Sequence, residues 1–185
     1  MSEEVSILKE LKTKDGQNLI LRRPILEDAE KMVNYLKTIG GESDNLLFGK
    51  NEFNLSIEQE REFVNNLNSN KDNTFMVIGI INHEIVSIAQ INRPVKKRIS
   101  HNSEIAISVK KDYWSIGVGS AVMHELIDFA RNNSIRNISL GVKASNSKAI
   151  RLYEKFGFKK VGCHKNYFNV NGTFDDEILM DLCIY

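Results

Sequence analysis

Residues 109–123 read VKKDYWSIGVGSAVM, and this stretch decides the fold. It passes from a strand into a turn that carries Gly117 and Gly119, and then into a helix. Glycines let a backbone approach a ligand closely and adopt unusual φ values. The first N–H groups of a helix lack internal acceptors and carry partial positive charge. The stretch therefore predicts a strand-to-helix turn that binds a phosphate or pyrophosphate group.

Two better-known phosphate motifs do not match this turn. The dinucleotide fingerprint needs a glycine or alanine at position 122, where this chain has valine. The Gly-Lys-Ser/Thr end of a Walker loop is missing from the segment. A nucleotide-binding Rossmann domain is therefore disfavoured. An ordinary tight turn remains the alternative for the two glycines taken alone.

A second segment, residues 146–158, reads NSKAIRLYEKFGF. Asn146 and Tyr153 are two helical turns apart and so share one face of the expected helix, with Ala149 between them. A small residue at that place leaves room for a ligand. The alternative is that the aromatic residues of this helix form only a core stripe.

Taken together, the two segments resemble the acetyl-CoA signature of the GNAT superfamily of N-acetyltransferases. That signature is roughly [QR]-x-x-G-x-[GA] followed by N-x-x-A-x-x-L-Y-x-x-x-G-F. The chain matches it at both glycines and from Asn146 to Phe158, and departs from it at Trp114, which stands in place of Gln or Arg. In element order the resemblance covers about residues 18–183, and its specific part is residues 102–160.

The resemblance implies direct transfer of an acetyl group from acetyl-CoA to a primary amine of a small molecule or a protein. It implies that the pantetheine arm lies between strands at 105–109 and 139–142, where Asn146 hydrogen-bonds it. A backbone N–H of Ser108 or Val109 would polarise the thioester carbonyl. The pyrophosphate would be held by backbone N–H groups of the glycine turn, which are those of Ile116, Gly117, Val118, Gly119 and Ser120.

Two side chains are the candidate acid and base. Tyr153 is expected to supply a proton to the departing thiolate, and it also contributes to cofactor binding. Glu104 is expected to take the proton of the acceptor amine, because it lies on the strand that presents the thioester. A solvated charge at a strand start is the alternative for Glu104. Further base candidates are His101, Glu42 and Asp44.

The hydrophobic periodicity predicts a single α/β domain over residues 1–185. The fold class is a GNAT-like mixed, mostly antiparallel sheet with helices on both faces and a splayed central parallel strand pair. Residues 1–14 are expected to be a loose arm and residues 40–53 a loop. Strands are predicted at 18–23, 74–81, 84–92, 104–109, 137–142, 158–163 and 177–184, and helices at 27–39, 56–68, 117–130 and 146–156.

Composition indicates which kinds of partner and which location to expect for this protein. The net charge of +1 gives no basic field for nucleic acid. No run of about 18 apolar residues and no signal-peptide pattern occurs, which predicts a cytoplasmic protein without a membrane partner. Cys163 and Cys183 are expected to be buried thiols, and the scattered histidines predict no metal site. A homodimer, an acyl chain longer than acetyl and a CoA-binding sensor or interaction module without turnover remain open.

Overall fold

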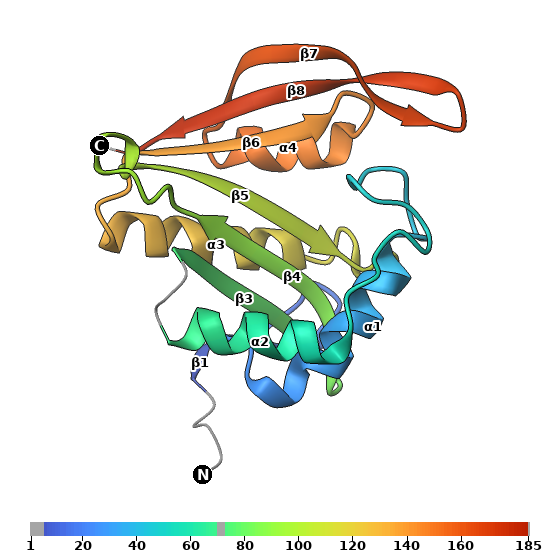
Figure 1. Cartoon of the computed structure of the whole chain (residues 1–185), viewed down its shortest axis with the longest axis vertical. Helices are drawn as coiled ribbons and strands as arrows, with labels where there is room; N and C mark the ends of the chain where they lie inside the picture. The colour runs from blue at the N-terminus through green and yellow to red at the C-terminus, as the bar shows by residue number, and fades with distance from the viewer. Residues whose placement is uncertain (1–5, 70–72, 185) are drawn as a thin grey trace.

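The computed structural model describes residues 6–69 and 73–184. Its centre is one eight-stranded sheet in the order β1-β2-β3-β4-β5-β6-β8-β7, shown in Figure 1. Every neighbouring pair is antiparallel except β5 and β6, which are parallel. The strands are β1 (Ile7–Lys12), β2 (Asn18–Arg22), β3 (Thr74–Ile81), β4 (Glu84–Asn92), β5 (Asn102–Val109), β6 (Asn137–Lys143), β7 (Lys159–Val170) and β8 (Thr173–Cys183).

Helices cover both faces of the sheet, as predicted, so the fold class is confirmed. In Figure 1, α1 and α2 lie in front of β3 and β4, whereas α3 and α4 lie behind the sheet. The α-helices are α1 (Ala29–Ile39), α2 (Ile57–Asn68), α3 (Val118–Asn132) and α4 (Ser147–Lys155). Short 3-10 turns are η1 (Leu26–Asp28), η2 (Lys97–Ile99) and η3 (Lys111–Tyr113). None of these helices combines the length and apolar character needed to cross a bilayer, within the residues described.

The sheet separates two apolar cores. The larger one joins the strands to the inner face of α3, with Val122 and Leu126 fully buried. The smaller one joins α1 and α2 to β3 and β4, with Met32 and Val64 fully buried. Because β3 and β4 are covered on both faces, their sequences are almost continuously apolar rather than alternating.

Local sequence signals set the helix ends. Ser56 caps α2, because its side-chain oxygen accepts a hydrogen bond from the Gln59 N–H. The Gln59 side-chain oxygen in turn accepts from the Ser56 N–H, which completes the predicted capping box. Asn146 caps α4 by accepting from the Ala149 N–H. Gly157 follows α4 with φ of 93°, a left-handed conformation that favours glycine at a helix end.

The expectation of a loose arm fails for residues 7–12, because they form β1 along the edge of the sheet. A bulge between Ile7 and Lys9 breaks the alternation. Leu8 and Leu11 therefore both contact the core although they are three residues apart. That spacing hides a strand from a search for a period of two.

The last two strands are longer than predicted, and the cysteine prediction is wrong. β7 and β8 meet at an Asn171-Gly172 turn, in which both residues have positive φ, the usual two-residue hairpin. Most of β7 is exposed, so it lacks the apolar alternation by which a strand is found. Cys163 in β7 and Cys183 at the end of β8 are both exposed free thiols rather than buried ones.

A buried ion pair fixes the start of α1, and its loss should destabilise the fold. Both terminal guanidinium nitrogens of Arg22 donate to the Asp28 carboxylate, at 2.6 and 2.7 Å, and both side chains are nearly covered. Asp28→Asn leaves the guanidinium buried without its counter-charge, so we expect a loss of about 3 to 5 kcal/mol in the free energy of unfolding. Urea denaturation measures it. Asp128→Asn, which breaks the exposed pair with Arg131, is the matched control and should change little.

Candidate active site

The parallel strands β5 and β6 separate along their length. They are paired only where residues 102–104 face residues 137–139. β5 continues to Val109 and β6 to Lys143 without further pairing to each other. This confirms the predicted splay. The backbone of both strands beyond Glu104 and Ser139 therefore borders an opening in the middle of the sheet.

The glycine turn lies beyond the end of β5 at the start of α3. Gly117 is the N-cap of α3 and has φ of 106°, which L side chains rarely adopt. The loop after β1 supports the turn, since the Lys14 N–H donates to the Ile116 carbonyl at 2.9 Å. The first turn of α3 carries no acidic residue, and neither does that of α4, whereas α1 has Glu30 and α2 has Glu58 and Glu60. The partial positive charge of this helix end is therefore not neutralised, which suits an anion.

Gly119 has a different role from Gly117. A Cβ at this position would lie 3.2 Å from Leu152 Cδ2 in α4 and 4.0 Å from Val109 Cγ2. Glycine thus allows the first turn of α3 to approach α4 and the end of β5. Its neighbours Val118 and Ser120 continue the same turn, with Val118 fully buried and Ser120 partly exposed.

The end of β5 presents one backbone N–H to the opening. The Lys110 N–H donates to the Val86 carbonyl of β4, and N–H directions alternate along a strand. Ser108 N–H therefore points to β4, and Val109 N–H points away from β4 toward the opening. The Trp114 indole N–H donates to the Val109 carbonyl at 2.7 Å, which holds the next peptide, between Val109 and Lys110. Ser108 is held on the other face, where its hydroxyl accepts from the Tyr35 hydroxyl.

Tyr153 in α4 carries an unused hydrogen-bond donor. Its ring packs against the larger core and lies 5.9 Å from the Phe158 ring, between centroids. Its hydroxyl makes no hydrogen bond to any residue within 6–69 or 73–184. Burial raises the pKa of the Tyr153 phenol to about 12, so the proton stays on the oxygen at neutral pH. Asn146 begins the same helix, and its side-chain oxygen is already used by the cap.

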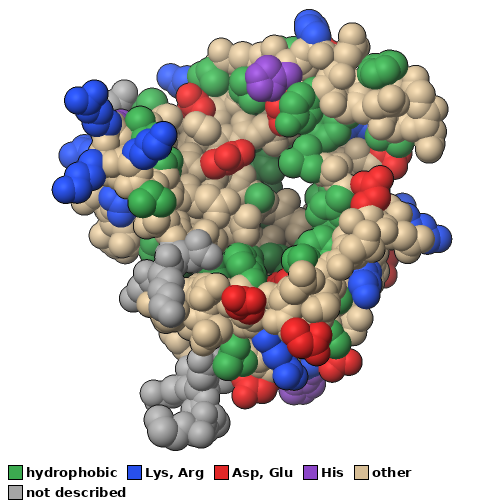
Figure 2. Space-filling model, in the orientation of Figure 1, with side chains coloured by type: hydrophobic (Ala, Val, Ile, Leu, Met, Phe, Trp, Pro, Cys, Tyr) green, Lys and Arg blue, Asp and Glu red, His purple; other side chains and the backbone are tan. Residues whose placement is uncertain are grey.

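The opposite face of the opening is hollowed and acidic. Figure 2 views this face and shows a hollow at its middle with acidic side chains around it. Two cavities of about 420 and 400 Å³ adjoin each other between β5 and β6, because Glu104 and Ser139 line both. The second cavity is also lined by His164 and Glu177. Glu104, predicted as the base, is thus exposed to the hollow rather than buried in the sheet.

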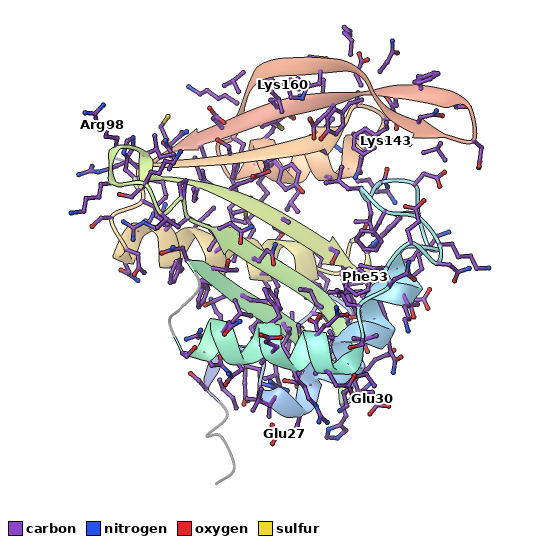
Figure 3. All side chains as sticks on the ribbon, viewed as in Figure 1. Glu27, Glu30, Phe53, Arg98, Lys143 and Lys160 are labelled. Atoms are coloured by element: carbon purple, nitrogen blue, oxygen red, sulfur yellow. The ribbon has the colours of Figure 1, made fainter. Side chains whose placement is uncertain are left out.

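The three further base candidates, Glu42, Asp44 and His101, lie at different places around the sheet. Glu42 accepts a hydrogen bond from the Lys111 N–H at 2.8 Å, which ties the 40–53 loop to the segment after β5. The Asp44 carbonyl accepts from Lys143 Nζ at 3.1 Å. Figure 3 shows Lys143 and Phe53 on the two sides of this opening. His101 lies at the start of β5, the end opposite Val109, and the structure does not bring it to the turn.

Sequence reasoning missed a histidine–carboxylate pair at the second cavity. His164 Nδ1 lies 2.8 Å from Glu177 Oε2. The two residues are 13 apart in the chain and belong to β7 and β8, so no local motif joins them. The one signal in the sequence was the position of Glu177, an acidic residue at the start of the apolar run EILMDLCI. The structure shows that its side chain is buried. Within the described residues, no group of three or more His, Cys, Asp or Glu is placed to hold a metal ion.

Comparison with known proteins places the chain in a family of acetyltransferases. The family model for the Acetyltransferase (GNAT) family matches residues 44–158, more than half of the chain. The chain therefore belongs to the GNAT acetyltransferase family, as its two sequence segments predicted.

Relatives and solved structures agree with the family assignment. The [ribosomal protein bS18]-alanine N-acetyltransferase of Escherichia coli is 37% identical over 78 residues, which are 42% of this chain and 53% of that enzyme. The L-amino acid N-acetyltransferase AaaT of E. coli is 31% identical over 105 residues, 56% of this chain and 65% of that one. The chain thus spans about half to two thirds of the length of these relatives.

Two solved structures show the same fold over nearly the whole chain. A GNAT-family acetyltransferase from Streptococcus pneumoniae has a TM-score of 0.85 at 29% identity, covering 90% of this chain and 99% of that one. The yncA protein of Salmonella typhimurium, solved with its cofactor acetyl-CoA, has a TM-score of 0.77 at 16% identity, covering 90% and 94%. At that identity the second likeness concerns the fold alone.

Proposed function

We propose that this protein transfers the acetyl group of acetyl-CoA directly to a primary amine. The observation that carries the proposal is the separation of β5 from β6 beside a helix N-terminus without acidic residues. Acetyl-CoA fits this arrangement, because its extended pantetheine arm needs a narrow opening and its charged pyrophosphate needs an anion site. Membership of the GNAT acetyltransferase family supports it, and the yncA protein shows that this fold can hold acetyl-CoA.

The residues would hold acetyl-CoA as follows. Backbone N–H groups of residues 116–120 bind the pyrophosphate, and the arm runs between β5 and β6. The side-chain oxygen of Asn146 is used by the helix cap, so its side-chain NH2 group is the part that hydrogen-bonds the arm. The Val109 N–H polarises the thioester carbonyl, because N–H directions alternate along β5 and this one points into the opening. Acetyl-CoA supplies the activated acyl group.

The chemistry needs one proton acceptor and one hydrogen-bond donor. The amine nitrogen forms a bond to the carbonyl carbon while the C–S bond breaks. The proton that the nitrogen releases passes to a basic side chain of the hollow, and the sulfur leaves as a thiolate that water protonates. Glu104 lies in the hollow on the side from which an amine can approach, and its carboxylate draws the ammonium form toward the carbonyl. Tyr153 donates a hydrogen bond to the leaving sulfur. Its pKa of about 12 makes it a donor that does not ionise in the working range.

The acceptor is proposed only as a class. One relative is named for the alanine of a ribosomal protein and another for free L-amino acids. Both acceptors are primary amines that carry positive charge before reaction, and both suit an acidic hollow. A cytoplasmic location, a homodimer and independence from metal ions are part of the proposal and await tests of their own.

A transfer assay tests the proposed function. The protein is incubated with acetyl-CoA and either L-amino acids, a peptide that begins with alanine, or a polyamine. Thiol release and mass spectrometry of the amine report the products. We expect acetylated amine and CoA in equal amounts with at least one acceptor class. Binding of acetyl-CoA without transfer to any of them would favour the alternative, a CoA-binding module without turnover.

A further inference from the structure

We infer that His164 and Glu177 form the proton-accepting pair for the acceptor amine. The inference rests on the proposed acetyl transfer and assigns its base to the β7–β8 hairpin. Both residues lie beyond the segment that the family model matches, which ends at residue 158. The pair therefore lies outside the segment on which the family assignment rests.

The geometry of the pair is that of an oriented imidazole. Nδ1 of His164 lies 2.8 Å from Oε2 of Glu177. The Glu177 side chain is 10% exposed, whereas that of His164 is 55% exposed. The carboxylate thus sits in the wall while the ring reaches the open cavity. Because Nδ1 faces the carboxylate, Nε2 is the ring nitrogen left to take a proton, as in other histidines oriented by a buried acid.

Gly141 in β6 makes room for this carboxylate. A Cβ at position 141 would lie 2.1 Å from Glu177 Oε1 and 2.7 Å from Cδ, far inside van der Waals contact. The Glu177 carboxylate therefore occupies the space above β6 in which the side chain of residue 141 would stand. Gly141 lies past the last paired position, Ser139, so this space borders the opening between β5 and β6. The pair is thus placed beside the strand that splays.

Other charged groups face the pair, and most of them are acidic. The His164 and Tyr167 rings stack at 5.5 Å between centroids. The cation opposite Glu177 in register is Lys143, whose Nζ donates to the Asp44 carbonyl at 3.1 Å. The remaining titratable groups of the cavity are Glu104 from β5, Tyr167 from β7 and Asp181 from β8. The carboxylates of Glu104 and Asp181 thus add to that of Glu177 and make this cavity acidic, which attracts a cationic amine.

The proton balance of the step is as follows. The amine nitrogen forms its bond to the carbonyl carbon while the C–S bond breaks. Nε2 of His164 takes the proton that the nitrogen releases, and Glu177 balances the positive charge of the ring. The sulfur departs as a thiolate that is hydrogen-bonded by Tyr153 and takes up a proton from water, and the proton held by His164 returns to water before the next turnover. Glu104 then acts as a positioning residue for the ammonium group.

Four variants test the pair. His164→Gln is safe for folding because the ring is more than half exposed. Glu177→Gln keeps the side-chain shape, and Gly141→Ala displaces the carboxylate without removing a titratable group. Asp176→Asn is the matched control, since it removes the next carboxylate of β8, which points to the other face and pairs with Lys165. We expect the first three to lower kcat about 100-fold or more, and the control to keep it within twofold.

Acetyl-CoA affinity and the pH profile separate the outcomes. All four variants should bind acetyl-CoA as the wild-type protein does, and His164→Gln should lose the rise of kcat/KM with pH that loss of the imidazole proton causes. His164→Gln and Glu177→Gln within threefold of wild type, with the pH profile unchanged, would overturn the inference and leave the transferase proposal standing. A wild-type protein that binds acetyl-CoA but acetylates no amine would also overturn it. No binding of acetyl-CoA would instead refute the proposed function.

Discussion

Replacing Tyr153 with phenylalanine should lower kcat about 100-fold and leave the affinity for acetyl-CoA within about twofold. The substitution removes only the hydroxyl, and that oxygen bonds to no other residue of the described chain. The packing of the ring against Phe158 and the core is kept. The loss therefore falls on the step in which sulfur leaves as an anion. Steady-state kinetics give kcat, and titration calorimetry gives the affinity.

Tyr113→Phe is the matched control for this variant. The Tyr113 hydroxyl donates to Glu84 at 3.3 Å, at the β3–β4 hairpin. Its removal should leave kcat unchanged. Because the pKa of the Tyr153 phenol is raised to about 12, its ionisation should cause no fall of the wild-type rate between pH 7 and pH 10. Unchanged turnover in Tyr153→Phe would refute the donor role of this residue.

Placing an aspartate at Ser120 should weaken acetyl-CoA binding about 100-fold while the fold stays intact. Ser120 lies in the first turn of α3, where acidic side chains are favourable to the helix by about 0.3 to 1 kcal/mol. The same charge repels a pyrophosphate bound at this turn, at a cost of about 3 kcal/mol for charges some 5 Å apart in a medium with an effective dielectric constant near 20. Stability and affinity are thus expected to change in opposite directions.

Ser120→Asn separates charge from size in that experiment. Asparagine has nearly the same shape as aspartate and no charge, so its affinity for acetyl-CoA should stay within about tenfold of the wild-type value. Thermal denaturation checks that both variants fold. Equal affinities for the aspartate and asparagine variants would show that no phosphate group lies near this turn.

Much of the fold could be predicted because its signals are local. The capping box at Ser56, the apolar stripe of α3 and the β3–β4 runs each depend on neighbours in sequence. The misses are places where tertiary packing decides. β1 is an edge strand with a bulge, and its apolar residues follow no simple period. Most of β7 is exposed, so its residues give no apolar pattern to detect.

The candidate site, too, has parts that could be predicted from local sequence and parts that depend on tertiary structure. The turn at Gly117 and the helix that begins at Asn146 could be found because each is one continuous segment. The choice of Val109 over Ser108 needed the hydrogen-bond alternation between β4 and β5. The approach of Glu177 to Gly141 depends on the register of β8 against β6, which no motif in either strand specifies.

Titration of the purified protein with acetyl-CoA, with NAD and ATP as controls, tests the central claim most directly. The claim is that the opening between β5 and β6, together with the turn at Gly117, holds a CoA thioester. We predict saturable binding of acetyl-CoA with a Kd in the micromolar range, about −8 kcal/mol, and none of NAD or ATP. No detectable binding of acetyl-CoA, or equal binding of all three, would contradict the account.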